Sequence, residues 1–153
     1  MNILFVCHGN ICRSTMAEFV MADLLEKASL EGVEVDSAAT SREEIGNPPH
    51  WGTVQKLKQA GVPIRAHRAW QVTPSDAERY DLIVGMDAWN MANLRRMLPP
   101  ALHDRLHLLL EFAGESRDIA DPWYTGNFDA TYDDVRQGCA ALLKHLQDQA
   151  PSP

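Results

Sequence analysis

The sequence lacks the features of a membrane-spanning or secreted protein. Its 153 residues contain no apolar run that approaches the roughly 18 residues of a membrane-spanning helix. The short apolar stretch near the N-terminus follows no basic segment, so a secretory signal is not expected. The net charge of −7 argues against a broad nucleic-acid-binding surface. We therefore expect a soluble, cytoplasmic protein with no membrane or nucleic-acid partner.

Cysteine is also scarce. The three cysteines, Cys7, Cys12 and Cys139, are an odd number and do not make a disulfide framework. No Cys-x-x-Cys pair occurs, and His103 and His107, four residues apart, have no evident third ligand. We therefore expect no metal and no cofactor, and we expect cysteines that are buried or reactive in a reducing compartment.

Length and composition indicate one globular domain. A chain of 153 residues with 45% apolar and 23% charged residues falls within the usual range of a single domain. No internal repeat or linker interrupts it. We expect one domain over residues 1–153, with a loose tail at 149–153.

Alternating strand and helix patterns predict an α/β fold. Four segments have the pattern of strands: 2–7, 33–37, 80–86 and 106–110. Four segments have helical periodicity: from Ser14 towards Gly32, 51–60, 89–97, and from near Thr131 onward. The segment 113–129 is expected to be irregular. This alternation predicts a three-layer domain in which helices flank a central four-stranded parallel sheet.

The segment between the first strand and the first helix has the composition of an anion site. It reads Cys7-His8-Gly9-Asn10-Ile11-Cys12-Arg13-Ser14. Ligands of parallel sheets bind beyond the carboxyl ends of the strands, where this segment lies. A short loop there turns backbone N–H groups inward, and the N-terminus of the following helix adds partial positive charge. We therefore predict a phosphate-binding loop after the first strand.

Three side chains of this loop predict nucleophilic chemistry. A cysteine that faces several N–H donors is stabilised as a thiolate, so Cys7 is the candidate nucleophile. Arg13 offers a planar fork that matches two phosphate oxygens. Ser14 can donate a hydrogen bond to the sulfur. The Cys-x5-Arg spacing is common by chance, but its position between a buried strand and an amphipathic helix favours attack by sulfur on a bound oxyanion.

The segment 6–14 resembles the phosphate-binding loop of the low-molecular-weight protein tyrosine phosphatases. Further segments match motifs of that family in the same order: Val35-Asp36-Ser37-Ala38, residues 66–72, Met86-Asp87, and Asp121-Pro122-Trp123-Tyr124. The resemblance therefore covers nearly the whole chain. It implies a metal-independent protein-tyrosine phosphatase that hydrolyses phosphotyrosine and aryl phosphates through a cysteinyl-phosphate intermediate.

The resemblance also implies a role for each matching residue. Cys7 would be the nucleophile, Arg13 the phosphate clamp and Asp121 the general acid and base. The remaining residues expected to bind phosphate or substrate are His8, Gly9, Asn10, Ile11, Cys12, Ser14, Trp123 and Tyr124. Of these, Trp123 and Tyr124 would form a wall of the substrate cleft.

Further roles follow from the same resemblance. Ser37 and His67 would support the loop through hydrogen bonds. Cys12 could form a reversible disulfide with Cys7. Cys139 lies on the apolar stripe of the last predicted helix and is expected in the core.

Alternatives on the same fold remain open at this point. An arsenate reductase needs two further cysteines, which are absent between Trp70 and Leu110. An arginine phosphatase has threonine where this chain has Ile11, so the apolar residue favours an aryl phosphate. A domain that only binds or carries phosphate would not need a separate acid such as Asp121. The expected partner is a phosphotyrosine protein, with a tyrosine kinase as one candidate, and the expected state is a monomer or weak dimer.

Overall fold

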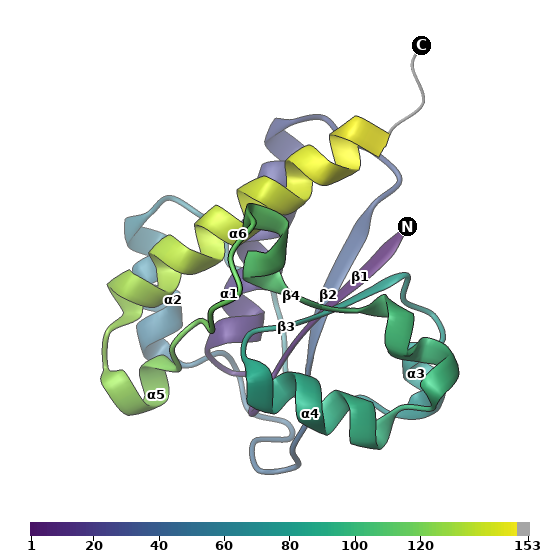
Figure 1. Ribbon diagram of the computed structural model, residues 1–153. Helices are drawn as coiled ribbons and strands as arrows, with labels where there is room; N and C mark the ends of the chain where they lie inside the picture. Colours follow the sequence, from purple (N-terminus) through teal and green to yellow (C-terminus); the bar gives the residue numbers. More distant parts are fainter. Residues whose placement is uncertain (150–153) are drawn as a thin grey trace.

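The computed structural model describes residues 1–149 and contains a four-stranded sheet with helices on both sides (Figure 1). The elements, in chain order, are β1 (Asn2–Cys7), α1 (Arg13–Lys27), β2 (Glu34–Ala39), α2 (Trp51–Gln59), α3 (Pro74–Ala77), β3 (Leu82–Gly85), α4 (Ala88–Met97), the 3-10 helix η1 (Pro100–Arg105), β4 (Leu106–Leu108), the 3-10 helix η2 (Leu109–Ala113), α5 (Pro122–Thr125) and α6 (Phe128–Gln149). The predicted tail covers 149–153; Gln149 ends α6, and residues 150–153 lie outside the described part. No helix within residues 1–149 is long and apolar enough to cross a membrane.

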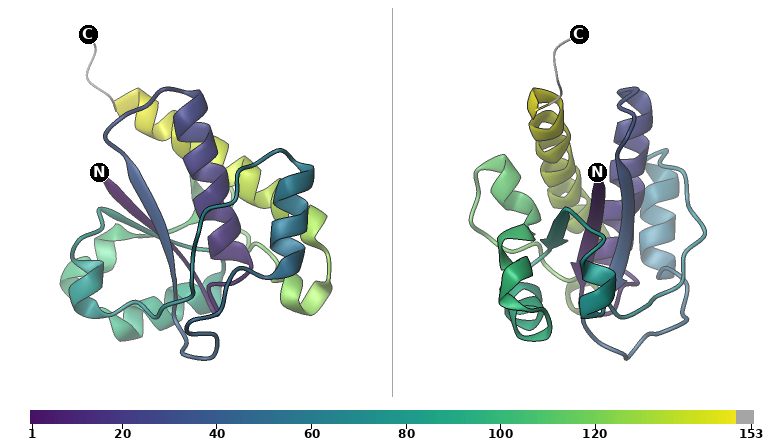
Figure 2. Two further views of the ribbon diagram at one scale, coloured as in Figure 1. Left: turned by 180° about the vertical axis from the view of Figure 1, so that it is seen from behind. Right: turned by 90° about the vertical axis from the view of Figure 1, so that its right-hand side faces the viewer.

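All strand pairs in the sheet are parallel, and the strand order is β2-β1-β3-β4. β1 is an inner strand, so its backbone bonds to β2 on one side and to β3 on the other. Its register with β2 runs from Asn2 opposite Glu34 to Cys7 opposite Ala39. Two views of the ribbon show the sheet as the middle layer (Figure 2). The predicted fold class, an α/β domain around a four-stranded parallel sheet, is confirmed.

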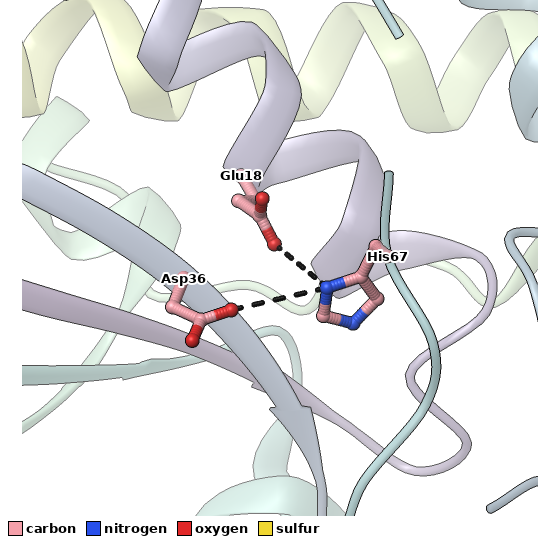
Figure 3. Close-up of side chains that lie close together, drawn as sticks. All are labelled: Glu18, Asp36 and His67. Atoms are coloured by element: carbon pink, nitrogen blue, oxygen red, sulfur yellow. Dashed lines mark ion pairs between the residues drawn. The ribbon is translucent and has the colours of Figure 1, made fainter. Parts of the chain in front are cut away.

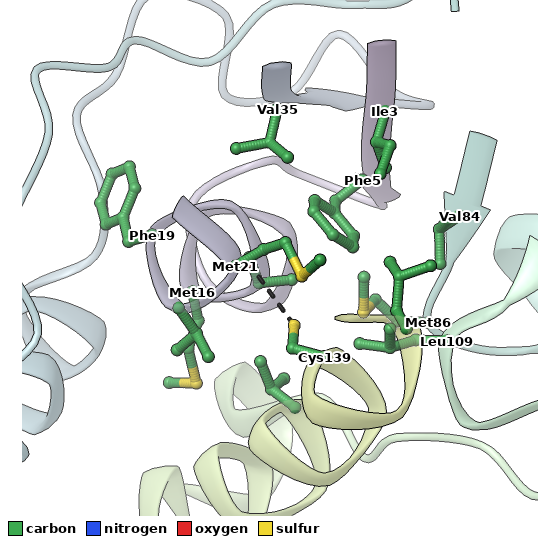
Figure 4. Close-up of a cluster of buried hydrophobic side chains, with 14 of the residues drawn as sticks. Ile3, Phe5, Met16, Phe19, Met21, Val35, Val84, Met86, Leu109 and Cys139 are labelled. Atoms are coloured by element: carbon green, nitrogen blue, oxygen red, sulfur yellow. Dashed lines mark hydrogen bonds between the residues drawn. The ribbon is translucent and has the colours of Figure 1, made fainter. Parts of the chain in front are cut away.

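The two faces of β1 explain why its sequence is apolar from Ile3 to Cys7. Ile3 and Phe5 lie in one buried cluster, together with residues of α1 and α6, and Leu4 and Val6 lie in the other, with residues of α3 and α4. Alternate side chains of a strand point to opposite faces, so a strand covered on both sides has no polar position. Figure 4 shows the first cluster, where Cys139 of α6 lies against α1 and its thiol donates a hydrogen bond to the Ala17 carbonyl at 3.7 Å. Cys139 is fully buried, as expected.

The first helix is shorter than its apolar pattern predicted. It ends at Lys27 instead of continuing to Gly32. Ser29 follows with a positive φ of 52°, and Gly32 has φ 81°, so the chain turns twice before β2 begins. A left-handed residue cannot continue an α-helix, and the first of them ends α1 before the glycine is reached.

The segment 113–129 is more regular than predicted. It contains α5, where the Asp121 side chain accepts a hydrogen bond from the Trp123 N–H and Pro122 takes the first helical position. Gly126 ends this turn in the left-handed conformation. α6 then begins at Phe128, earlier than the predicted start near Thr131. Short turns of this kind depend on capping and not on periodicity, so the apolar pattern did not reveal them.

α6 approaches η2 closely at a glycine. A Cβ atom built on Gly138 would lie 2.5 Å from Cγ of Leu109, which is buried. Real Cβ atoms do not come this close to carbon, so the contact between α6 and η2 requires glycine at this position.

Gly138→Ala should therefore destabilise the protein by about 1–3 kcal/mol, because the added methyl group overpacks the contact with Leu109. In an exposed helix the same change would be stabilising by nearly 1 kcal/mol. The exposed neighbour Gln137 provides the control, and Gln137→Ala should change the free energy of unfolding by less than about 0.5 kcal/mol. Urea unfolding measures both values. A Gly138→Ala variant as stable as the parent protein would contradict this packing argument.

Candidate active site

The loop 8–12 joins β1 to α1 and surrounds the sulfur of Cys7. The Sγ atom accepts hydrogen bonds from the backbone N–H of Asn10 at 3.3 Å and of Ser14 at 3.4 Å. The Ser14 hydroxyl lies 3.0 Å from the same sulfur. Donors that converge on a sulfur stabilise its thiolate form. The sequence-based expectation of a nest of donors after the first strand therefore matches the geometry of this loop.

Asn10 determines the shape of the loop. It is fully buried and has a positive φ of 59°, a conformation that asparagine tolerates better than most residues. Its side-chain Nδ2 donates to the hydroxyls of Ser14, at 2.8 Å, and Ser37, at 3.0 Å. The remaining Oδ1 is an acceptor and lies 2.7 Å from Nε2 of His67, which donates to it when that nitrogen carries a proton. The four polar residues form one network behind the sulfur.

A second group of polar side chains lies behind His67 (Figure 3). Nδ1 of His67 is 3.3 Å from Oε1 of Glu18 and 3.8 Å from Oδ1 of Asp36. Glu18 also accepts the hydroxyl hydrogen of Ser37 at 2.7 Å and pairs with Arg65 at 3.2 Å. Burial raises the pKa of Glu18 to about 7 and lowers the pKa of His67. The hydrogen-bond network of the loop thus connects to two buried ionisable side chains, those of His67 and Glu18.

Glu18, Asp36 and His67 have ligand atoms close enough together to hold a metal ion. The oxygens of Glu18 are already engaged, one by the Ser37 hydroxyl and the other by the Arg65 guanidinium. A cation bound here would also meet the positive charge of Arg65. The arrangement therefore fits a support for the loop better than it fits a metal site.

Arg13 is held at one end of its guanidinium. Nη1 donates to Oδ2 of Asp87 at 2.6 Å and to the backbone carbonyl of Ile119 at 2.9 Å. Nη2 reaches Oδ2 of Asp121 at 3.5 Å, and the side chain is only 3% exposed. Among contacts within residues 1–149, Nε has no hydrogen bond. The edge formed by Nε and Nη2 is the one that could receive two oxygens of an anion.

A cavity opens above the loop at the carboxyl edge of the sheet. It is lined by Cys7, His8, Gly9, Ile11, Cys12, Glu43, Glu44, Asp121, Trp123 and Tyr124. Trp123 and Tyr124 are 56% and 81% exposed, so a ligand can reach both rings, although the ring of Trp123 also packs edge-on against His50. Asp121 faces the cavity from the start of α5, where its Oδ1 caps the helix.

Not every predicted site residue lines this cavity. The side chains of Asn10 and Ser14 are fully buried behind the loop, so they could meet an anion only through their backbone N–H groups. Ser37 and His67 lie one layer further back. Arg13 lines a neighbouring groove, to which Asp121 also contributes. Cys7, Arg13 and Asp121 are therefore brought together from two distant parts of the chain, the segment 7–13 and the start of α5.

Comparison with known proteins decides the family. The sequence model of the low molecular weight phosphotyrosine protein phosphatases matches residues 2–152. The chain belongs to this family. The resemblance predicted from five short segments and the enzyme class, a protein-tyrosine phosphatase, are thereby confirmed.

Individual relatives align with the phosphatase over nearly its whole length. Low molecular weight protein-tyrosine-phosphatase YfkJ of Bacillus subtilis (strain 168) is 40% identical over 151 residues, which make up 97% of each chain. The crystal structure of YfkJ has a TM-score of 0.92 at 39% identity and covers 99% of this chain and 97% of that one. The crystal structure of DARP, a drosophila arginine phosphatase, has a TM-score of 0.90 at 32% identity, with 98% and 100% covered.

Three residues of the phosphatase site belong to no motif in the sequence. Glu18 is a single acid within the apolar run 16–21 of α1, and an acid in such a run is a signal that it is buried with a partner. Glu43 and Glu44 are exposed residues of the segment that follows β2. Their sequence context gives no signal, because exposed acids on loops are common.

Cys12 differs from Cys7 in its surroundings. Both thiols are free and buried, and both line the cavity. Burial raises the pKa of Cys12 to about 12, and the nearby Cys7 and Asp121 add to the effect. At neutral pH Cys12 is therefore a neutral thiol. Its predicted disulfide with Cys7 stays a prediction.

A Cys7→Ser variant isolates the reactivity of Cys12. Labelling of Cys12 by iodoacetamide should be slow at pH 7, because the thiolate is the reacting form and burial, the main cause of the raised pKa of Cys12, remains when Cys7 is replaced. The rate, followed by mass spectrometry of the Cys12 peptide, should rise about tenfold per pH unit up to at least pH 10. The same variant unfolded in urea is the control. A rate that levels off near neutral pH in the folded variant would contradict the assignment.

Proposed function

We propose that this phosphatase hydrolyses phosphotyrosine in proteins, and aryl phosphates in general, through a cysteinyl-phosphate intermediate. The observation that carries the proposal is the convergence of two backbone N–H groups and one hydroxyl on the Cys7 sulfur. The sulfur lies at the base of a cavity whose rim carries two exposed aromatic side chains. A phosphorylated ring can thus place its phosphate over the sulfur of Cys7.

In the first step, the thiolate of Cys7 attacks phosphorus in line with the leaving phenolic oxygen. A phosphorus–sulfur bond forms, the phosphorus–oxygen bond to the ring breaks, and Asp121 gives its proton to the departing oxygen. Arg13 contributes its Nε and Nη2 edge to the equatorial oxygens, where charge builds up in the transition state. Asp87 and the Ile119 carbonyl hold the other end of that guanidinium.

In the second step, water attacks the phosphorus and the phosphorus–sulfur bond breaks. Asp121, now a carboxylate, takes the proton from the water, and the products are inorganic phosphate and the thiolate of Cys7. The hydroxyl of Ser14, 3.0 Å from the sulfur, stabilises that thiolate as it leaves. Cys7 thus supplies the nucleophile, Asp121 the proton transfers, and Arg13 with the backbone donors the stabilisation of charge.

The substrate class rests on the walls of the cavity. Trp123 and Tyr124 offer exposed rings beside the acid, and Ile11 adds an apolar side chain at its lining. An aryl group is well suited to these surfaces. The similarity to an arginine phosphatase makes phosphoarginine the competing substrate, and arsenate reduction lacks the cysteines for a thiol relay, since Cys139 is buried in α6.

We also propose where and in what state the phosphatase works. The mechanism needs a reduced thiol at Cys7, and a reducing cytoplasm maintains one. The proposed catalytic groups all come from one chain, so a monomer or weak dimer suffices. The partner would be a phosphotyrosine protein, with a tyrosine kinase as one candidate.

The first test measures phosphate release from matched phosphotyrosine, phosphoarginine and phosphoserine peptides in the presence of a chelator. We expect phosphotyrosine to be hydrolysed fastest, and Cys7→Ser to lower that rate by at least about 10⁴-fold because it removes the nucleophile. Vanadate binding by the variant, followed by calorimetry, shows whether the loop is still formed. Faster release from phosphoarginine would change the substrate class, and a largely retained rate in Cys7→Ser would disprove the nucleophile.

The second test concerns Asp121. Asp121→Asn keeps the size of the side chain but removes the proton that the phenolate needs, so the loss of rate should grow as the leaving group becomes more basic. We expect a loss of about 10²-fold to 10³-fold for phosphotyrosine and a smaller one for p-nitrophenyl phosphate. Single-turnover rates across substituted phenyl phosphates measure this. Equal losses for all leaving groups would refute the acid role.

A further inference from the structure

The segment 40–49 brings two acids to the mouth of the catalytic cavity. Its start is fixed by hydrogen bonds from the backbone N–H of Thr40 to the Cys7 carbonyl, at 3.0 Å, and from that of Ser41 to the His8 carbonyl, at 3.1 Å. The acids that follow, Glu43 and Glu44, line the same cavity as the nucleophile. The backbone of the segment that carries them is thus hydrogen-bonded to the end of β1 and to the first residue of the phosphate-binding loop.

Each acid has a defined position. The Glu43 carboxylate lies 3.0 Å from Nε2 of His8 and its side chain is 69% exposed. The Glu44 carboxylate accepts a hydrogen bond of 2.6 Å from the Asn47 side chain, and its Cγ packs beside Gly9. Neither acid pairs with a lysine or an arginine anywhere in residues 1–149.

The mouth of the cavity carries negatively charged side chains, which would repel a phosphate dianion. Glu43, Glu44 and Asp121 all line the cavity. Arg13 lines the neighbouring groove, where it pairs with Asp87 and Asp121, so it does not neutralise the two glutamates. Arg42 precedes the two acids in the sequence but is not among the lining residues. A substrate that carries its own positive charge beside the phosphorylated ring would relieve this repulsion and would pair with the exposed carboxylates.

We propose that Glu43 and Glu44 select phosphotyrosine segments that carry lysine or arginine next to the phosphotyrosine. This inference rests on the proposed phosphatase function and adds the charge of the preferred substrate. The carboxylates act on binding of the flanking residues and not on the reacting atoms. Exposed ion pairs are weak individually, so each acid should contribute up to about fivefold in kcat/KM, and less at high salt.

The test compares three phosphotyrosine peptides that differ only in having lysine, glutamine or glutamate on both sides of the phosphotyrosine. The enzymes are the parent protein, Glu43→Gln/Glu44→Gln, and Glu31→Gln/Glu34→Gln. The last is a matched control, because it removes the same charge at the opposite end of β2. Each kcat/KM is divided by that enzyme's own value for p-nitrophenyl phosphate, which has no flanking charge.

We expect the parent protein and the control variant to favour the lysine peptide over the glutamate peptide by about tenfold at low salt. In Glu43→Gln/Glu44→Gln this ratio should fall to about twofold, and 0.5 M NaCl should have the same effect on the parent protein. An unchanged ratio in that variant, or a parent protein that does not distinguish the peptides, would overturn the inference while p-nitrophenyl phosphate is still hydrolysed. Loss of that hydrolysis in the parent protein would instead overturn the proposed function.

Discussion

The convergence of hydrogen-bond donors on the sulfur of Cys7 is the interaction on which the rest of the site depends. Two of the three donors belong to the backbone, so their positions follow from the path of the loop and not from side-chain rotamers. That path requires a positive φ at Asn10, which the surrounding hydrogen bonds hold in place. The conformation of one buried asparagine therefore determines the electrostatic surroundings of the proposed nucleophile.

The surrounding fold holds the phosphate-binding loop in its conformation. β1 is an inner strand, and its carboxyl end at Cys7 is fixed by neighbours on both sides. The loop then continues directly into α1, which packs against α6 and the sheet. Ser37 of β2 and His67 of the segment before α3 complete the network from outside the loop. A strained loop is maintained in this way by a rigid scaffold that it does not itself stabilise.

The sequence was sufficient to predict the sheet, most of the helices and the proposed catalytic groups. A strand that is apolar at five consecutive positions, 3–7, and a helix of period 3.6 have strong patterns, and the loop between them carries an unusual set of residues. The partners of Glu18 and the position of Glu43 at the cavity mouth could not be predicted. Both depend on contacts between segments far apart in the chain, and neither residue type nor spacing encodes those contacts. Short capped turns such as α5 were missed for the related reason that two or three residues determine them.

The contacts of Arg13 also bear on the order in which the protein can fold. The arginine bonds to Asp87, 74 residues later, and to the Ile119 carbonyl, 106 residues later. A chain made from its N-terminus therefore contains the whole phosphate-binding sequence long before the partners of this guanidinium exist. Closing loops of this length is slow, and the longer one cannot close until Ile119 has been made. A nascent chain that stops before Ile119 has the residues of the loop and Asp87, but it lacks the Ile119 carbonyl and the Asp121 carboxylate that complete the contacts of the arginine.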